Sequence, residues 1–177
     1  MLRDGKRRKW LAILILCSCA AVVLAFAFES LLRIENKREI AARTRSLPPF
    51  EFFTLGGERF MKNDLSAGLP LILVRFNTQC DYCRTEIDTI VDAIDLFGRA
   101  HILLISSEPE GVIRSFVESS KVRSCPKIRV LQDKDLNFAR IFGASLVPRT
   151  LIYDSKWNLA GDYLGETKVE ALLSHLH

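Results

Sequence analysis

Residues 69–83, LPLILVRFNTQCDYC, decide the fold class of this chain. The continuous apolar run over 69–76 is typical of a strand buried on both faces of a sheet. Cys80 and Cys83 follow this run closely, and a helical pattern over 81–97 comes next. That pattern rests on apolar residues at helical spacing, namely Ile87, Ile90, Val91, Ile94 and Phe97. The stretch therefore predicts a buried strand that leads into a helix with a two-cysteine motif at its start.

A pair of cysteines at the start of a helix is suited to redox chemistry. The helix N-terminus carries free N–H groups and roughly half a positive charge, which stabilises a thiolate, the reactive form of cysteine. Two residues separate the cysteines, so their sulfurs lie close enough to bond. We expect Cys80 to be the exposed nucleophile and Cys83, one turn deeper, to be the resolving thiol. Asp81 puts a negative charge beside Cys80, which disfavours the thiolate and predicts a reducing couple.

Strand and helix signals alternate through residues 48–177, which we expect to form one domain. A hairpin is expected around Gly56-Gly57. Further strands are predicted over 101–106, 128–131, 150–154 and 158–164, and further helices over 112–117, 135–142 and 169–176. This order predicts an α/β fold with a mixed central sheet, an antiparallel hairpin near the C-terminus, and helices on both faces.

The segment before this domain predicts a membrane anchor. Residues 1–9 are basic, and residues 10–28 contain no charge. At about 1.5 Å per residue that run spans roughly 28 Å as a helix, close to the ~30 Å hydrocarbon core. The positive-inside rule places the basic end in the cytoplasm and the domain outside it. Residues 29–47, rich in charged helix formers, are expected to form a stalk.

Two alternatives to an uncleaved anchor stay open. Ala25-Phe26-Ala27 offers a cleavage pattern for a signal peptide, and Cys19 offers a lipidation site.

The distribution of charge argues against nucleic-acid binding. The net charge of +4 comes from the N-terminal tail, and the chain after Trp10 is balanced. The sequence therefore predicts a lipid bilayer as a partner and no nucleic acid.

The sequence also resembles a known family. LILVRFNTQCDYCRTEIDTI (71–90) is similar to the active-site region of TlpA/ResA-type bacterial membrane-anchored thioredoxin-like reductases, which belong with the AhpC/TSA-like redoxins. VLQDKDLNFARIFGASLVPRTLIYDSKWNLAGDYLGE (130–166) is similar to the family segment that carries a cis-proline. The resemblance covers residues 48–177. It departs at Gln79, where the family often has Trp, and at Asp81-Tyr82, where it often has Pro.

The resemblance implies a thioredoxin-like fold and the activity of a thiol–disulfide oxidoreductase. Such an enzyme would need no cofactor beyond its redox-active Cys80–Cys83 disulfide. Its partners would be exported proteins, such as those with the haem-binding cysteines of c-type cytochromes, and a membrane electron donor. An antioxidant role is a further implication. Attack by Cys80 and resolution by Cys83 would carry the reaction.

The resemblance also implies further site residues. Glu86 would exchange a proton with the buried thiol, although a solvated acid on the first helical turns fits the sequence almost as well. Pro148 would be cis, and Val147 would then offer its backbone to an extended substrate beside Cys80. The alternative is an ordinary trans proline that opens an edge strand. Asp81 and Tyr82 would contact the substrate.

Competing interpretations of the cysteines remain. A zinc site lacks ligands, because Cys125 and three histidines are the main candidates left, and we expect no metal. A structural Cys80–Cys83 disulfide in a non-enzymatic, membrane-tethered binding module is the main alternative function. A peroxidase pattern is weak because Thr78 lies two residues before Cys80 instead of three. Cys125 is expected to be a part-buried structural thiol, with a second resolving cysteine as the alternative.

Overall fold

The computed structural model describes residues 3–143 and 146–176, without the side chains of residues 3–17, Cys19 and Ala21. It divides into two compact units, Met1–Glu39 and Ile40–His177. Helix α1 (Arg3–Thr44) makes up the described part of the first unit and ends inside the second. Within the described residues, no helix is both long and apolar enough to cross a membrane. Much of the predicted anchor, and both Cys17 and Cys19, lie outside the described side chains, so the anchor stays a prediction.

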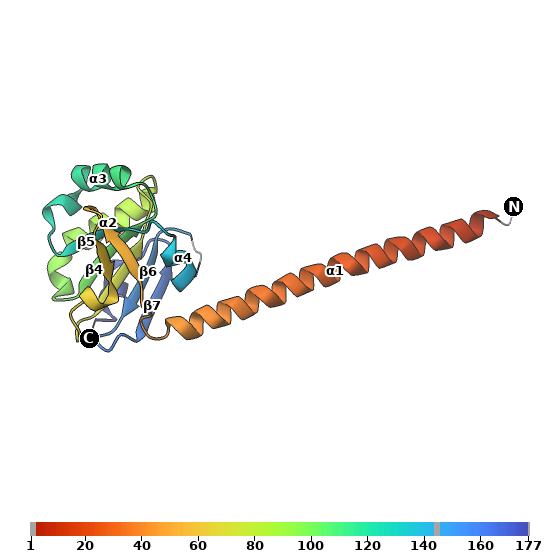
Figure 1. Ribbon diagram of the computed structural model, residues 1–177, viewed down its shortest axis with the longest axis horizontal. Coiled ribbons are helices and arrows are strands. Elements are labelled where there is room, and N and C mark those ends of the chain that lie inside the picture. The colour runs from red at the N-terminus through yellow and green to blue at the C-terminus, as the bar shows by residue number, and fades with distance from the viewer. Residues whose placement is uncertain (1–2, 144–145, 177) are drawn as a thin grey trace. The chain divides into compact units, whose positions relative to one another are not determined.

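The second unit is built on a seven-stranded sheet in the order β2-β1-β5-β4-β3-β6-β7, and Figure 1 labels most of its elements. Its strands are β1 (Glu51–Thr54), β2 (Arg59–Met61), β3 (Leu71–Arg75), β4 (His101–Ser106), β5 (Ile128–Gln132), β6 (Arg149–Tyr153) and β7 (Leu159–Leu164). Strands β3, β4 and β5 are parallel, whereas the β1–β2, β1–β5, β3–β6 and β6–β7 pairs are antiparallel. The sequence-based prediction of a mixed sheet is confirmed.

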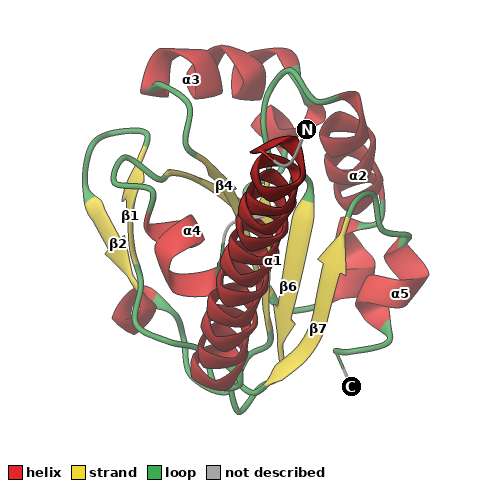
Figure 2. Ribbon diagram, turned by 90° about the vertical axis from the view of Figure 1, so that its right-hand side faces the viewer, coloured by secondary structure: helices red, strands yellow, loops and turns green. Residues whose placement is uncertain are grey.

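Strand β3 lies inside the sheet, between β4 and β6, and both of its faces are apolar. Its alternate side chains enter two separate cores: Ile72 and Val74 enter one, and Leu71 and Leu73 enter the other. Helices α2 (Asp81–Asp92), α3 (Glu110–Ser119) and α5 (Val169–Leu173) cover the first face. Helix α4 (Asn137–Phe142) covers the second. Figure 2 shows β6 and β7 side by side, and the prediction of helices on both faces is confirmed.

The long helix predicted over 81–97 is wrong in its C-terminal part. Helix α2 ends at Asp92, and a separate 3₁₀ turn covers Ile94–Phe97. At Ala93 the backbone N–H donates to the carbonyls of both Thr89 and Val91, so the chain tightens there instead of continuing the α-helix. This turn allows Phe97 to reach the core with 4% of its surface exposed. Apolar spacing alone does not distinguish one helix from two successive ones.

Candidate active site

Cys80 lies at the point where the chain leaves β3 and enters α2. It is the N-cap residue of the helix, with extended backbone, and its Sγ accepts a hydrogen bond of 3.3 Å from the backbone N–H of Cys83. Cys80 is half-buried, whereas Cys83 is fully buried. Neither cysteine is in a disulfide in this structure. The more accessible sulfur therefore sits where the helix N–H groups point at it, and the second sulfur lies beneath it.

The Cys83 thiol is held in its neutral form. Burial raises its pKa to about 12, and the hydrogen bond it shares with the Cys80 side chain and the nearby Glu86 carboxylate add to the rise. At neutral pH almost none of this thiol is ionised. Because the thiolate is the form that attacks a disulfide, Cys83 can react only if a neighbouring group takes its proton.

Glu86 lies one turn after Cys83 on the same face of α2, and only 1% of its surface is exposed. Its Oε1 accepts a 2.6 Å hydrogen bond from the hydroxyl of Thr150 on β6, while its buried Oε2 has no hydrogen-bond partner of normal geometry among the described residues. Burial raises the pKa of Glu86 from 4.5 to about 7, and the hydrogen bond from Thr150 opposes part of the rise. The alternative of a solvated acid is wrong. Glu86 is suited to exchanging a proton near neutral pH.

The loop between β3 and Cys80 is fixed by a carboxylate from the next strand along the sheet. Glu108 follows β4, and its carboxylate accepts hydrogen bonds from the backbone N–H of Thr78 (2.7 Å) and from the Thr78 hydroxyl (2.9 Å). The Ser106 hydroxyl donates a third, at 3.0 Å. The Thr78 side chain thus pairs with Glu108 and not with Cys80.

Val147 forms the facing wall of the site. Its carbonyl oxygen lies 3.9 Å from Cys80 Sγ, and the Val147–Pro148 peptide bond is cis, as predicted. The alternative of a trans proline that opens an edge strand is wrong, since β6 lies between β3 and β7. A groove of ≈ 430 Å³ adjoins this wall. It is lined by Arg75, Phe76, Asn77, Ser106, Ser107, Glu108, Leu146 and Val147.

The chain has counterparts among known proteins. The model of the AhpC/TSA family matches residues 44–161. The chain belongs to the AhpC/TSA family. No curated protein sequence is significantly similar to it.

Three solved structures illustrate the similarity. DsbF of Mycobacterium tuberculosis is 19% identical, covers 76% of this chain and 94% of its own, and superposes with a TM-score of 0.63. A secreted M. tuberculosis disulfide oxidoreductase homologous to E. coli DsbE is 18% identical, with 76% and 98% covered and a TM-score of 0.61. A thiol:disulfide interchange protein of Chlorobium tepidum is 20% identical, with 73% and 97% covered and a TM-score of 0.60. These similarities establish the thioredoxin-like fold and, with the family membership, support the prediction of a thioredoxin-like oxidoreductase.

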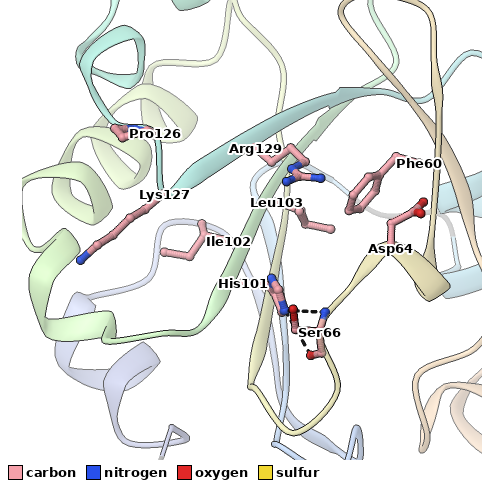
Figure 3. Close-up of a pocket in the computed structure, with 9 residues that line it drawn as sticks. All are labelled: Phe60, Asp64, Ser66, His101, Ile102, Leu103, Pro126, Lys127 and Arg129. Carbon is pink, nitrogen blue, oxygen red and sulfur yellow. Dashed lines mark hydrogen bonds between the residues drawn. The ribbon is translucent and has the colours of Figure 1, made fainter.

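Four further residues, Asp81, Tyr82, Cys125 and His101, lie in different surroundings. Asp81 and Tyr82 are exposed beside Cys80, with Tyr82 68% exposed, so a docked partner can touch both. Cys125 is buried in the core on the α2 face, consistent with a structural thiol. His101 lines a smaller hollow of ≈ 160 Å³ at the start of β4, where its Nε2 lies 3.1 Å from the Ser66 nitrogen and 3.2 Å from the Ser66 oxygen (Figure 3). This hollow lies at the opposite end of the strands from Cys80.

Two residues of the site were not predicted. Thr150 lies inside an apolar strand, and only the antiparallel pairing of Val74 with Thr150 places its hydroxyl over Glu86. The position of Glu108 could have been predicted from the sequence. It follows β4, and the carboxyl ends of neighbouring parallel strands meet at one edge of a sheet, so polar residues after β4 lie beside the loop after β3.

Proposed function

We propose that this chain is a thiol–disulfide oxidoreductase that reduces disulfides in exported proteins. The observation that carries the proposal is the pairing of a deeply buried thiol, Cys83, with a buried carboxyl, Glu86, whose pKa is raised to about 7. A structural disulfide needs no such base. A resolving cysteine does need one, because its proton must leave before it can attack.

The reaction proceeds in two exchanges. The Cys80 thiolate attacks one sulfur of the substrate disulfide, and the other substrate sulfur leaves as a thiolate that takes up a proton. Glu86, in its carboxylate form, then accepts the proton of Cys83. The resulting Cys83 thiolate attacks Cys80 Sγ and releases the second substrate thiolate. Two electrons have passed to the substrate, and the chain is left with a Cys80–Cys83 disulfide.

The backbone of Val147 would bind the substrate during these steps. Its carbonyl lies beside Cys80 Sγ, so an extended substrate segment can pair with it as an added strand. Pro148 follows Val147 directly, and exposed Asp81 and Tyr82, next to Cys80 in the chain, would also contact the partner. A reduced state is restored by a dithiol donor, which we propose to be a membrane protein.

We also propose that residues 10–28 anchor the chain in the cytoplasmic membrane, with the second unit on the outer side. The uncharged run and its basic flank support this topology. One structural neighbour is described as secreted, and another, from Streptococcus pneumoniae, as an exposed lipoprotein thioredoxin, which supports an extracytoplasmic site of action. Apocytochromes c are the finer substrate proposal, and it rests on the resemblance to TlpA/ResA-type reductases.

Partner trapping tests the proposed function. In full-length Cys83→Ser, exchange should stop after the first step and leave substrate proteins disulfide-bonded to Cys80. Cys80→Ser with Cys83→Ser is the matched control and should trap nothing. The Cys80–Cys83 couple should also lie between about −120 and −270 mV, the range of exchange proteins. A couple well below about −300 mV, together with no trapped partner, would identify a structural disulfide and a binding module instead.

A further inference from the structure

Arg149, the first residue of β6, follows Pro148 directly and points its guanidinium into the protein. Its side chain is 11% exposed. Nε and Nη2 donate to Oδ1 and Oδ2 of Asp162 on β7, at 2.9 and 2.8 Å, which is a two-point ion pair. Nη1 donates to the carbonyl oxygens of Phe142 (2.9 Å) and Gly143 (3.2 Å). One buried side chain therefore donates hydrogen bonds to four oxygen atoms.

Two of these acceptors, Phe142 and Gly143, precede Val147 in the chain, and Arg149 itself follows it. Phe142 ends helix α4, Gly143 is its C-cap, and Arg149 begins β6, so the guanidinium joins the end of α4 to the start of β6. Asp162 fixes the guanidinium to the neighbouring strand. Because a guanidinium presents its donors in a rigid planar fork, it fixes the direction of these contacts as well as their length.

The local backbone is built around this contact. Gly143 has a φ of +91°, a conformation that favours glycine, and a Cβ added there would lie 3.4 Å from Ile40 and 3.8 Å from Nη1 of Arg149. The turn thus aims the Gly143 carbonyl at Arg149, and a Cβ at this position would be in van der Waals contact with both side chains. Val147, two residues before Arg149, contacts Cys80, with its carbonyl oxygen 3.9 Å from the sulfur.

We propose that Arg149 is a positioning residue for polypeptide substrates. It holds Val147 at the distance from Cys80 at which a substrate segment can pair with the Val147 backbone while its disulfide meets the Cys80 sulfur. The inference rests on the proposed function and goes beyond it, because it separates two substrate classes. Extended polypeptides depend on Arg149, whereas small disulfides that need no backbone pairing do not.

Two chromogenic probes test this on the full-length reduced chain. One is 5,5′-dithiobis(2-nitrobenzoate), and the other is a short unstructured peptide whose single cysteine carries the same thionitrobenzoate group as a mixed disulfide. Both release the same coloured thiolate, two per molecule of the small disulfide and one per molecule of the peptide, so the rates are compared per disulfide reduced. Arg149→Met should raise the KM for the peptide about tenfold, the change expected for losing roughly 1.4 kcal/mol of binding. Its kcat/KM for the small disulfide should stay within about twofold of wild type.

Two further variants separate positioning from general damage. Tyr153 lies on β6, as Arg149 does, but its buried hydroxyl donates to the Thr44 carbonyl, away from Val147. Tyr153→Phe removes that hydrogen bond and should leave the KM for both probes unchanged. Arg149→Lys keeps a donor for the carbonyls without the fork and should recover part of the peptide KM. If Arg149→Met unfolds, Asp162→Asn supplies the test, because it weakens one side of the clamp and should raise the peptide KM by a smaller factor.

Equal losses on both probes, or an unchanged peptide KM, would overturn the positioning role. So would a wild-type protein that shows no KM advantage for the peptide. A wild-type protein that reduces neither probe would overturn the proposed function itself, and this inference with it.

Discussion

Replacing Glu86 with Gln should make the stability of this protein less sensitive to pH. Gln has nearly the same shape as Glu, and its side-chain carbonyl can still accept the hydrogen bond from the Thr150 hydroxyl. What the substitution removes is the capacity to ionise inside the core on the α2 face. The wild-type carboxyl must lose its proton there as the pH rises, and burial makes that unfavourable.

The sign follows from the raised pKa. In the folded chain Glu86 titrates at about 7, against its ordinary value of 4.5, so between these values the folded state holds more protons than the unfolded state. The stability associated with the neutral form is fully present below the unfolded value and is lost as the pH rises through the folded one. A shift of this size corresponds to about 3 kcal/mol at roughly 1.4 kcal/mol per unit. Since the side chain is 1% exposed, solvent screens little of it.

The assay is urea unfolding of the reduced full-length chain, followed by tryptophan fluorescence, for wild type and Glu86→Gln. The free energies of unfolding should be similar near about pH 4 and should differ by up to about 3 kcal/mol, in favour of the variant, near about pH 8. Asp81→Asn, which removes an exposed carboxyl from the same helix, is the matched control for loss of negative charge. A difference between Glu86→Gln and wild type that stays constant with pH would refute the raised pKa.

Glu86→Gln should also impair catalysis, although it raises stability at high pH. Without a base beside Cys83, resolution of the mixed disulfide should slow by about 100-fold, the lower end of the range for general acid–base catalysis. The first exchange, which uses Cys80, should keep its rate. Wild-type resolution should speed up as the pH rises through about 7, because Glu86 must be a carboxylate to accept the proton.

Three other outcomes follow from the structure. Brief alkylation of the reduced protein should modify half-buried Cys80 well before buried Cys83, and mass spectrometry showing equal labelling would reverse their assigned roles. Glu108→Ala should cost about 1–3 kcal/mol in urea unfolding, because it leaves the N–H and hydroxyl of Thr78 without their acceptor; a loss below ~0.5 kcal/mol would mean that these bonds contribute little. Protease added to spheroplasts should remove the second unit if residues 10–28 form the anchor, and a protected domain, or a soluble mature form, would exclude this topology.

The sequence alone determined the fold class and identified Cys80 and Cys83 as the candidate redox pair, because both conclusions depend on local patterns. A run such as Leu71–Val74 can only be satisfied by burial on both faces, and a helix that starts beside Cys80 directs its free N–H groups at the sulfur. The cis bond before Pro148 was reached through resemblance, since an X–Pro bond of unknown context is trans in most cases.

The state of Glu86 was decided only by the tertiary structure. Its position in the sequence suits a solvated acid and a buried base about equally well, and the choice between them depends on what covers that face of α2. Strand β6, paired with β3, brings Thr150 over the carboxyl, and the resulting loss of water raises its pKa. The same holds for Arg149, whose acceptors lie on α4 and β7. Such contacts join residues that are far apart in the chain, so no local pattern encodes them, and they exist only once the sheet has brought its strands together.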